Sequence, residues 1–461
     1  TRFDCDWSSD VCSSDLRYVS SLIFLVLLSS CSTDSAPNGM IVDMYPGPDA
    51  GNPNSLINYE GTLYMQLSDP DYGSEIWTYD GELLERISDI EPGSGNAVPS
   101  RFLIFQDELL FTALKEPYGR ELFMWDGSKD QLLKDIGGDP GSSRPGAFFE
   151  FNDILYFSAN DQKSGYELWQ WDGKEISQTS DINDGPASSS PKAMVELDGV
   201  MYFSAERAGF GTELFRYDGF TIDMIADLNP GPSGSLPRGL TVLGSTLYFQ
   251  AYTPDTGIEL FAFDGEDISI VEDLQPGTDS SSPRNLTGFA GKLFYVANSP
   301  EHGVELFLIS EGEGPELVAD IRPDERGSDP EQLFIAGEKM YFSANDGESG
   351  LELWQWSEAN GAQQVTDISE GVTGSDPHAF IQYDDVWTYF TARTERYGFE
   401  TWRTDGSTTE MLLDAWPGSN GSTPNDYGLI GNQVCFSAQD GIHGRELWCI
   451  SHDEAVPVMS R

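Results

Sequence analysis

Positive charge and histidine are scarce in this sequence of 461 residues. It has 25 Lys and Arg against 77 Asp and Glu, which gives a net charge of -52. An electrostatic field of that sign repels phosphate backbones and anionic lipid, so nucleic-acid binding is disfavoured. Only four histidines occur, no two of them have the spacing of zinc ligands, and the Gly-x-Ser-x-Gly nucleophile elbow is missing. We therefore expect no cofactor and no conventional catalytic site.

A long membrane-spanning run is also missing. Residues 18–30 are apolar but too few to cross a bilayer as a helix, and they run into the motif LSSC. This arrangement resembles the bacterial lipoprotein signal, in which the chain is cut before the Cys and the Cys is acylated. The resemblance implies a signal peptide over 17–30, lipidation of Cys31 and a tether over 31–38. Ser32 follows the Cys where a retention signal would have Asp, which favours the outer membrane, facing the surface or the periplasm, with this lipid as the only membrane contact.

The first residues differ in composition from everything that follows. Residues 6–16, DWSSDVCSSDL, match the in-frame translation of a string that resembles a common sequencing-library adapter. We therefore expect 1–16 to be an artefact and leave it out of the physical argument. Cys5 and Cys12 leave the cysteine count with it.

A repeat of 46 to 48 residues organises the chain from residue 39 to residue 455. One anchor is Gly-x-Glu, followed by Leu, Ile or Thr and then an aromatic residue. A second anchor is the Asp of turns such as DIEPG, and a Pro follows about ten residues later. The repeat Glu residues are Glu75, Glu121, Glu167, Glu213, Glu259, Glu305, Glu352, Glu400 and Glu446. The repeat Asp residues are Asp43, Asp89, Asp135, Asp181, Asp227, Asp273, Asp320, Asp367 and Asp414. A period of this length is typical of β-propeller blades.

One unit, residues 145–185, reads as four short strands. The expected strands are AFFEF, ILYFSA, YELWQWD and ISQTSDI, with an Asp-Gly hairpin turn after the third. A single such sheet cannot cover both of its faces, whereas stacking several around an axis buries them. The fold class is therefore all-β: one propeller of nine, alternatively eight, four-stranded blades. We expect GMIVDM (39–44) to complete the last blade, with AVPVM (455–459) as the competitor for that place.

The units over 41–451 resemble the bacterial ELWxxDGT repeat, also labelled hyalin-like. The best copies are FSANDQKSGYELWQWDG and FSANDGESGLELWQW, although the DGT part is shortened here. The resemblance implies an exported propeller. Two units also resemble the tryptophan-docking motif of quinoprotein propellers, which implies a Trp that locks one blade against the next. The matching residues are Ala159, Asp161, Ser164, Gly165 and Trp169, and Ala344, Asp346, Ser349, Gly350 and Trp354.

A residue that is present in every blade is expected to have the same role in each of them, whereas a catalytic group normally occurs only once in a propeller. We therefore interpret the repeat Glu and Asp as structural, the Glu holding a hairpin or its neighbour and the Asp fixing the turn before Pro-Gly. A weak calcium candidate is the set Asp69, Asp71 and Glu75, which alternate around a Gly. A glycosidase pair in the central channel stays open without assigned residues.

Cys435 and Cys449 flank the last hairpin, fourteen residues apart. If the hairpin is symmetric about Ile442, they face each other on adjacent strands, within disulfide range. The sequence predicts a disulfide that staples the last blade.

These observations favour a monomeric, lipid-anchored envelope propeller that is not an enzyme and that binds a glycan or protein partner. Two alternatives stay open: a periplasmic scaffold for outer-membrane assembly, and a carbohydrate-active enzyme with its site in the channel. Loops that depart from the consensus, 309–314 and 393–398, are where we expect a specific site to show.

Overall fold

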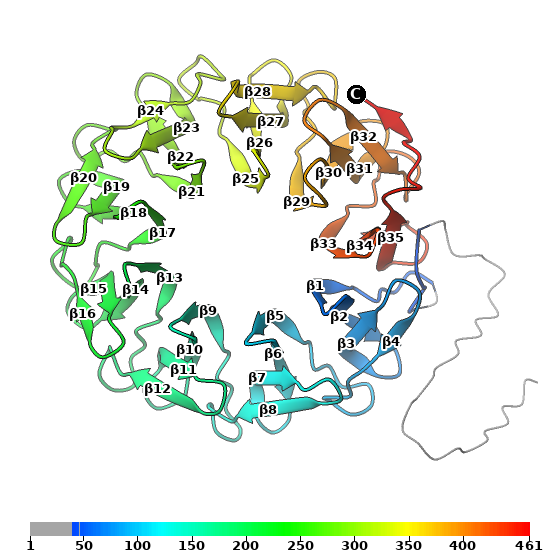
Figure 1. Cartoon of the computed structure of the whole chain (residues 1–461), viewed down its shortest axis with the longest axis horizontal. Coiled ribbons are helices and arrows are strands. Elements are labelled where there is room, and N and C mark those ends of the chain that lie inside the picture. The colour runs from blue at the N-terminus through cyan, green and yellow to red at the C-terminus, as the bar shows by residue number, and fades with distance from the viewer. Residues whose placement is uncertain (1–38, 46) are drawn as a thin grey trace, which may run out of the picture. The chain divides into compact units, whose positions relative to one another are not determined.

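The computed structural model describes residues 39–45 and 47–461, which form a ring of nine antiparallel sheets around a central opening (Figure 1). The all-β propeller is confirmed, and nine is the number of blades rather than eight. No helix among these residues is long and apolar enough to cross a membrane. The expected artefact, signal peptide, lipidation at Cys31 and tether lie outside the described residues.

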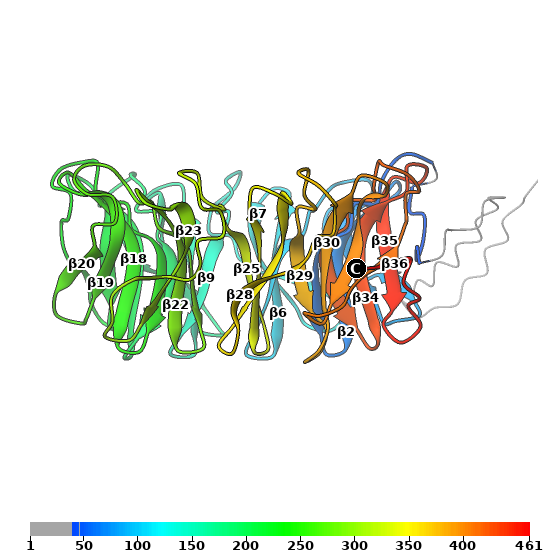
Figure 2. The ribbon, with the colours of Figure 1, turned by 90° about the horizontal axis from the view of Figure 1, so that it is seen from above.

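Each blade is a meander that runs outward from the opening, and the strands cross the thickness of the disc (Figure 2). Blades one to three are β1 (Asn54–Tyr59), β2 (Thr62–Asp69), β3 (Gly73–Tyr79) and β4 (Leu84–Arg86); β5 (Ser100–Phe105), β6 (Glu108–Lys115), β7 (Gly119–Trp125) and β8 (Asp130–Lys134); β9 (Gly146–Phe151), β10 (Ile154–Asn160), β11 (Tyr166–Trp171) and β12 (Ile176–Ser180). Blades four to six are β13 (Lys192–Leu197), β14 (Val200–Arg207), β15 (Gly211–Tyr217) and β16 (Ile222–Met224); β17 (Arg238–Leu243), β18 (Thr246–Thr253), β19 (Gly257–Phe263) and β20 (Ile268–Glu272); β21 (Arg284–Phe289), β22 (Lys292–Ser299), β23 (Gly303–Ser310) and β24 (Glu316–Leu317). Blades seven to nine are β25 (Glu331–Ala336), β26 (Lys339–Asn345), β27 (Leu351–Ser357) and β28 (Gly361–Thr366); β29 (His378–Gln382), β30 (Thr388–Thr394), β31 (Gly398–Thr404), β32 (Thr409–Leu413) and β36 (Met459–Ser460); β33 (Asn425–Ile430), β34 (Gln433–Gln439) and β35 (Arg445–Ser451).

The third blade shows why these residues form strands and turns. The middle strands β10 and β11 are largely buried, and Tyr156 pairs with Gln170 in the register that the repeat predicts. The Asp172 carboxylate accepts N–H bonds from Lys174 and Glu175 at 2.9 and 2.8 Å, and Gly173 takes φ +85°. Only Gly adopts that conformation without strain, so the Asp-Gly pair sets the turn.

Neighbouring blades pack through aromatic and aliphatic side chains. Phe105 of the second blade lies against Trp171 of the third, with ring centroids 5.4 Å apart. Leu122 and Phe157 belong to the same buried cluster. Because both faces of each sheet are covered in this way, the ring buries the surface that one blade leaves exposed.

The two chain ends complete different blades. The N-terminal segment pairs with β35 of the ninth blade through a Met40–Trp448 bridge, and the Ile41 N–H donates to the Leu447 carbonyl at 2.9 Å. This confirms the expected closure. The competing segment, residues 455–459, does not take that place, because the edge of β35 is already hydrogen-bonded to the N-terminal segment. The C-terminus instead adds β36 to the free edge of β32 in the eighth blade.

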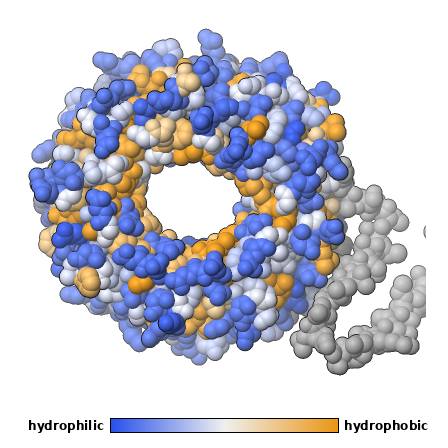
Figure 3. All heavy atoms as spheres, viewed as in Figure 1, coloured by the Kyte–Doolittle hydropathy of each residue, from blue (hydrophilic) through white to orange (hydrophobic). Residues whose placement is uncertain are grey.

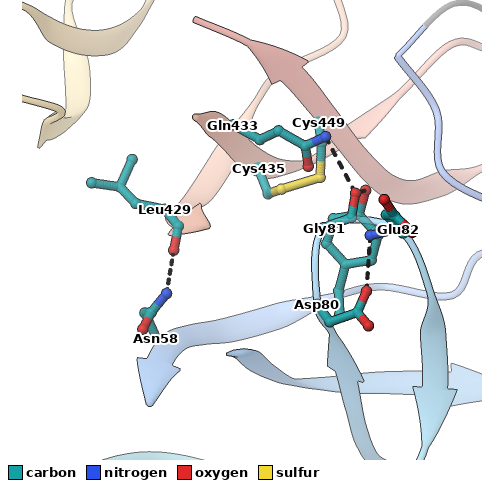
Figure 4. Close-up of a disulfide and its surroundings, with 9 residues drawn as sticks. Asn58, Asp80, Gly81, Glu82, Leu429, Gln433, Cys435 and Cys449 are labelled. Carbon is teal, nitrogen blue, oxygen red and sulfur yellow. Dashed lines mark hydrogen bonds between the residues drawn. A yellow bond between two sulfur atoms is a disulfide. The ribbon is translucent and has the colours of Figure 1, made fainter. Parts of the chain in front are cut away.

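Cys435 and Cys449 form the expected disulfide. They are directly opposite on β34 and β35, with Cα atoms 4.0 Å apart (Figure 4). The ninth blade contacts the first nearby, where the Asn58 side chain donates to the Leu429 carbonyl at 2.8 Å. The covalent link therefore lies in the blade that the two ends of the propeller must close.

Replacing both cysteines with Ser is expected to lower the free energy of unfolding by about 3 kcal/mol, because the bond joins residues 14 apart and so restricts the unfolded chain. Urea unfolding of the oxidised protein and the double variant measures the difference. Mass labelling of thiols provides the independent check: two free thiols at Cys435 and Cys449 in native protein would contradict the bond.

Candidate functional site

The repeat Glu residues are fully buried, each with no exposed side-chain surface. In the third blade, Glu167 Oε1 accepts the N–H of Ser189 at 2.7 Å, and Oε2 accepts the Ser189 hydroxyl at 2.6 Å and the Ile182 N–H at 2.9 Å. Ser189 lies in the connector to the next blade, and its carbonyl accepts the Glu206 N–H there at 2.7 Å. The Glu is structural, as expected, but what it holds is the connector between blades.

We call each such pair a carboxylate lock. Seven blades use a Ser that follows the Glu by 22 or 23 residues. The pairs are Glu121–Ser143, Glu167–Ser189, Glu213–Ser235, Glu259–Ser281, Glu305–Ser328, Glu352–Ser375 and Glu400–Ser422. The residue after each Ser adopts a left-handed φ, for example Ser190 at 47°, and its N–H donates back to the strand beside the Glu. These serines are not among the residues predicted from the sequence, although a Ser-x-Pro pattern marks all seven.

The locks of the first and ninth blades differ. Glu75 accepts the hydroxyl of Ser88 at 2.5 Å, because the usual Ser position is Ala97. Glu446 has Gly51 at that position; its Oε1 accepts the Gly51 N–H at 2.8 Å, and its Oε2 has no hydrogen-bond partner among the described residues. A Cβ on Gly51 would lie 2.5 Å from that oxygen, so a larger residue would not fit there without displacing the Glu446 side chain.

Burial raises the pKa of the repeat Glu residues, and hydrogen bonds only partly oppose it. The pKa rises to about 7 for Glu352 and for Glu400, and to about 8 for Glu446, which lacks the serine hydroxyl. Desolvation is the largest cause in each case because it penalises the charged form. These buried carboxyl groups therefore keep a proton to a higher pH than an exposed glutamate does.

The repeat Asp residues lie at the turns that follow the fourth strands. Asp135 accepts the N–H of Gly138 at 2.8 Å, Asp181 that of Gly185 at 3.3 Å, and Asp273 that of Gly277 at 3.2 Å. In these blades the Asp fixes the turn, as expected. The described part of the chain leaves one buried oxygen without a partner on several of them, namely Asp43, Asp227, Asp273, Asp367 and Asp414.

The calcium candidates are not gathered around a common point. Both oxygens of Glu75 accept hydrogen bonds from residues 88–91, and Asp69 accepts the N–H groups of Asp71 and Tyr72. Within residues 39–45 and 47–461, no group of three or more His, Cys, Asp or Glu side chains could hold a metal ion.

The first tryptophan-docking copy lies at a blade interface. Trp169 is 6% exposed and belongs to a cluster with Phe105 and Leu122 of the second blade. In the loop, Asp161 accepts the Ser164 N–H at 2.7 Å. Trp169 therefore packs against the preceding blade.

In contrast to the locks, the mouth of the channel varies from blade to blade. Each inner strand begins with a bulge, and its second residue has a left-handed φ between 51° and 63°. The inner strands line an open channel whose rim is partly apolar (Figure 3). The nine first residues of these strands are Asn54, Ser100, Gly146, Lys192, Arg238, Arg284, Glu331, His378 and Asn425. These residues differ too widely in size and charge to share one structural role. Their positions are therefore available to determine binding specificity.

The eighth blade departs most from the repeat. Its first hairpin, residues 383–387, is longer than the two-residue turns elsewhere and helps to line a cavity of about 540 Å³ against the seventh blade. The loop 393–398 contributes to a second cavity of about 290 Å³, whereas 309–314 joins β23 to β24. Side chains that line the larger cavity include Lys339, Gln382, Asp384, Asp385, Val386 and Ser407.

An aromatic cluster lies beside that hairpin. The ring of Tyr383 stacks on His452 with centroids 4.1 Å apart, and Tyr389 shares a 2.7 Å hydrogen bond with His452 Nδ1. The Arg403 guanidinium lies 4.3 Å from the centre of the Trp387 ring. Burial, followed by the charge of Arg403, lowers the pKa of His452, and both causes disfavour the charged form of this ring.

No protein-family model matches the chain, and no curated protein matches it. Similar solved structures include a puromycin-hydrolysing peptidase of Mycobacterium tuberculosis, with 11% identity and a TM-score of 0.40 over 78% of this chain and 60% of that one. The β-propeller domain of the Trilobed protease from Pyrococcus furiosus has 10% identity and a TM-score of 0.38 over 70% and 98%. The BP39L lectin from Burkholderia pseudomallei has 9% identity and a TM-score of 0.37 over 69% and 97%. The chain spans 60% of the length of the first of these, and scores this low carry no argument about function.

The carboxylate lock at the closure predicts a pH dependence. Since the pKa of Glu446 is about 8 in the folded protein and 4.5 in a model peptide, the native state keeps a proton that the unfolded chain releases. The free energy of unfolding should therefore fall as pH rises from about 4.5 to about 8. Glu446→Gln should flatten this slope, measured by urea unfolding across the range.

Glu352→Gln is the matched control, because the pKa of Glu352 is about 7 and its contribution should end at lower pH. Between pH 7 and pH 8 the Glu446 variant should change the slope more than the Glu352 variant does, because Glu352 has lost about half of its proton by pH 7. Identical slopes for the native chain and the Glu446 variant would refute the assignment.

Proposed function

We propose that this propeller is a non-catalytic binding module of the cell envelope, anchored by lipid at Cys31, with a glycan or protein as its partner. One observation carries the proposal. The Glu that is invariant in all nine blades is buried and held in structural hydrogen bonds, whereas residues at the channel mouth and in the eighth blade differ from blade to blade. Specificity is expected where the repeat breaks, and binding residues lie preferentially on loops of a rigid scaffold.

The lining of the larger cavity favours a glycan. It combines a lysine, an amide, three hydroxyls and four carboxylates, together with Val386. Such groups donate and accept hydrogen bonds in the way that sugar hydroxyls require, and an apolar side chain can cover the C–H face of a ring. A volume of about 540 Å³ is within the range of small-ligand pockets.

The anchor predicts where the protein is found. Native protein should partition into the detergent phase of a cloud-point extraction, and Cys31→Ala should move it to the aqueous phase, because acyl chains supply the membrane affinity. Protease treatment of intact cells then separates the two faces: digestion without permeabilisation supports a surface adhesin. Protection until permeabilisation would favour the periplasmic scaffold instead, and an unchanged partition of the Ala variant would contradict the anchor.

The eighth-blade cavity predicts a local loss of glycan binding. On an array of cell-envelope oligosaccharides, Asp385→Ala should weaken binding by about tenfold, the effect of losing one charge-assisted hydrogen bond. Asp198→Ala is the control, since Asp198 is an exposed residue in the corresponding hairpin of the fourth blade. Equal binding by both variants, or cleavage of any arrayed glycan, would contradict a non-catalytic site at this cavity.

A further inference from the structure

Positive charge, scarce in the chain as a whole, is concentrated at one part of the channel mouth. The sequence has 25 Lys and Arg in 461 residues. Five of them stand at or beside the start of the inner strand in five consecutive blades, the second to the sixth. We call this set the cation arc; its members are Arg101, Arg144, Lys192, Arg238 and Arg284. Its strands β5, β9, β13, β17 and β21 follow one another around the opening in Figure 1.

The arc is continuous because Arg101 reaches into the next blade. Its guanidinium donates to the Pro145 carbonyl at 3.3 Å. The first residue of β9 is Gly146, and a Cβ there would collide with the Arg101 guanidinium. Gly146 carries no charge, and Arg101 supplies a cation at that position. A positive charge is therefore found at the start of the inner strand in each of blades three to six.

Carboxylates do not neutralise most of the arc. Among residues 39–45 and 47–461, Arg284 pairs with Asp329, whereas Arg101, Arg144, Lys192 and Arg238 form no ion pair. Glu150 lies four residues along β9 from its start, roughly 13 Å at the rise of a strand. Arg101 and Arg144 also help to lower the pKa of Arg120, after burial, which places these charges close together.

Adjacent like charges repel, and a chain with 77 acidic residues could have paired them. An anion bound at the arc would relieve that repulsion. Because the cations spread over five blades around an open channel (Figure 3), they do not converge on one small ion. The arrangement fits a chain with anionic groups at intervals.

A cavity with several hydrogen-bonding side chains lies at the Arg284 end of the arc. A cavity of about 480 Å³ lies between the sixth and seventh blades. Its lining combines one arc member with amide, hydroxyl, carboxylate and apolar side chains: Arg284, Asn285, Thr287, Glu331, Gln332 and Leu333. Amides and hydroxyls in such a setting match the hydroxyls of a sugar.

We infer that the cation arc binds an acidic polysaccharide, whose carboxylate or sulfate groups lie on the arc and one of whose sugars enters the adjoining cavity. This inference rests on the proposed binding function and names the class of glycan. The large negative charge of the rest of the chain opposes loose contact with polyanions elsewhere on its surface, so binding depends on the arc.

The test compares charge reversals that change net charge equally. Lys192→Glu with Arg238→Glu alters the arc, whereas Lys163→Glu with Lys174→Glu alters two exposed lysines in hairpins of the third blade. All four side chains are exposed, so folding should survive, and circular dichroism checks this. The probes are polygalacturonate, dextran sulfate and neutral dextran, and the readout is the dissociation constant.

Native protein should bind polygalacturonate or dextran sulfate but not dextran, and the polymer that binds more tightly identifies the anionic group. The arc variant should weaken binding by about tenfold or more, while the hairpin variant stays within about twofold. The inference would be overturned if native protein bound neither polygalacturonate nor dextran sulfate, or if both variants lost binding equally. It would also be overturned if polyglutamate bound as tightly as the polysaccharide. If native protein binds an arrayed glycan but no polyanion, the inference fails and the proposed function stands; if it binds no envelope component at all, both fail.

Discussion

A buried carboxylate is costly unless hydrogen bonds replace the water that it has lost, and every blade of this propeller contains one. In most blades that carboxylate accepts two backbone N–H groups and a serine hydroxyl from the connector to the next blade. The hydrogen bonds to the carboxylate therefore hold the connector in place, and the connector determines where the next inner strand starts. Cores such as the Phe105–Trp171 contact supply the bulk of the burial, but the locks give each blade its place in the ring.

The closure shows what happens where this interaction is incomplete. The first and last blades are joined by a noncovalent bridge at Met40, and Glu446 meets Gly51 rather than a serine. The same blade holds the disulfide between Cys435 and Cys449. A covalent bond and a strand supplied by the other chain end thus reinforce the place where the hydrogen-bonded lock is poorest.

The repeat made most of the fold predictable, because nine copies of one unit report the same strands and turns. Strand bounds in the third blade, the disulfide and the role of residues 39–44 followed from spacing alone. The place of β36 did not, because two free edges compete for one tail and only the hydrogen bonds at β35 decide between them. The role of Ser189 could not be predicted from the sequence because serine is common in loops. Its burial against Glu167 arises only when the connector folds back. The cation arc was hidden because Arg101 acts in the blade after its own.

The central claim is that positions shared by all blades hold the ring, while positions that differ at the channel mouth bind the partner. One scan tests it directly: replacement, one at a time, of the Glu of each lock, of the first residue of each inner strand and of Arg101 and Arg144, read for folding and for binding of whichever polyanion, polygalacturonate or dextran sulfate, the native protein binds more tightly. The account predicts two separate classes, in which lock variants lose stability and mouth variants in the arc lose binding while staying folded. Lock variants that stay folded but lose binding, or arc variants that bind as the native protein does, would contradict it.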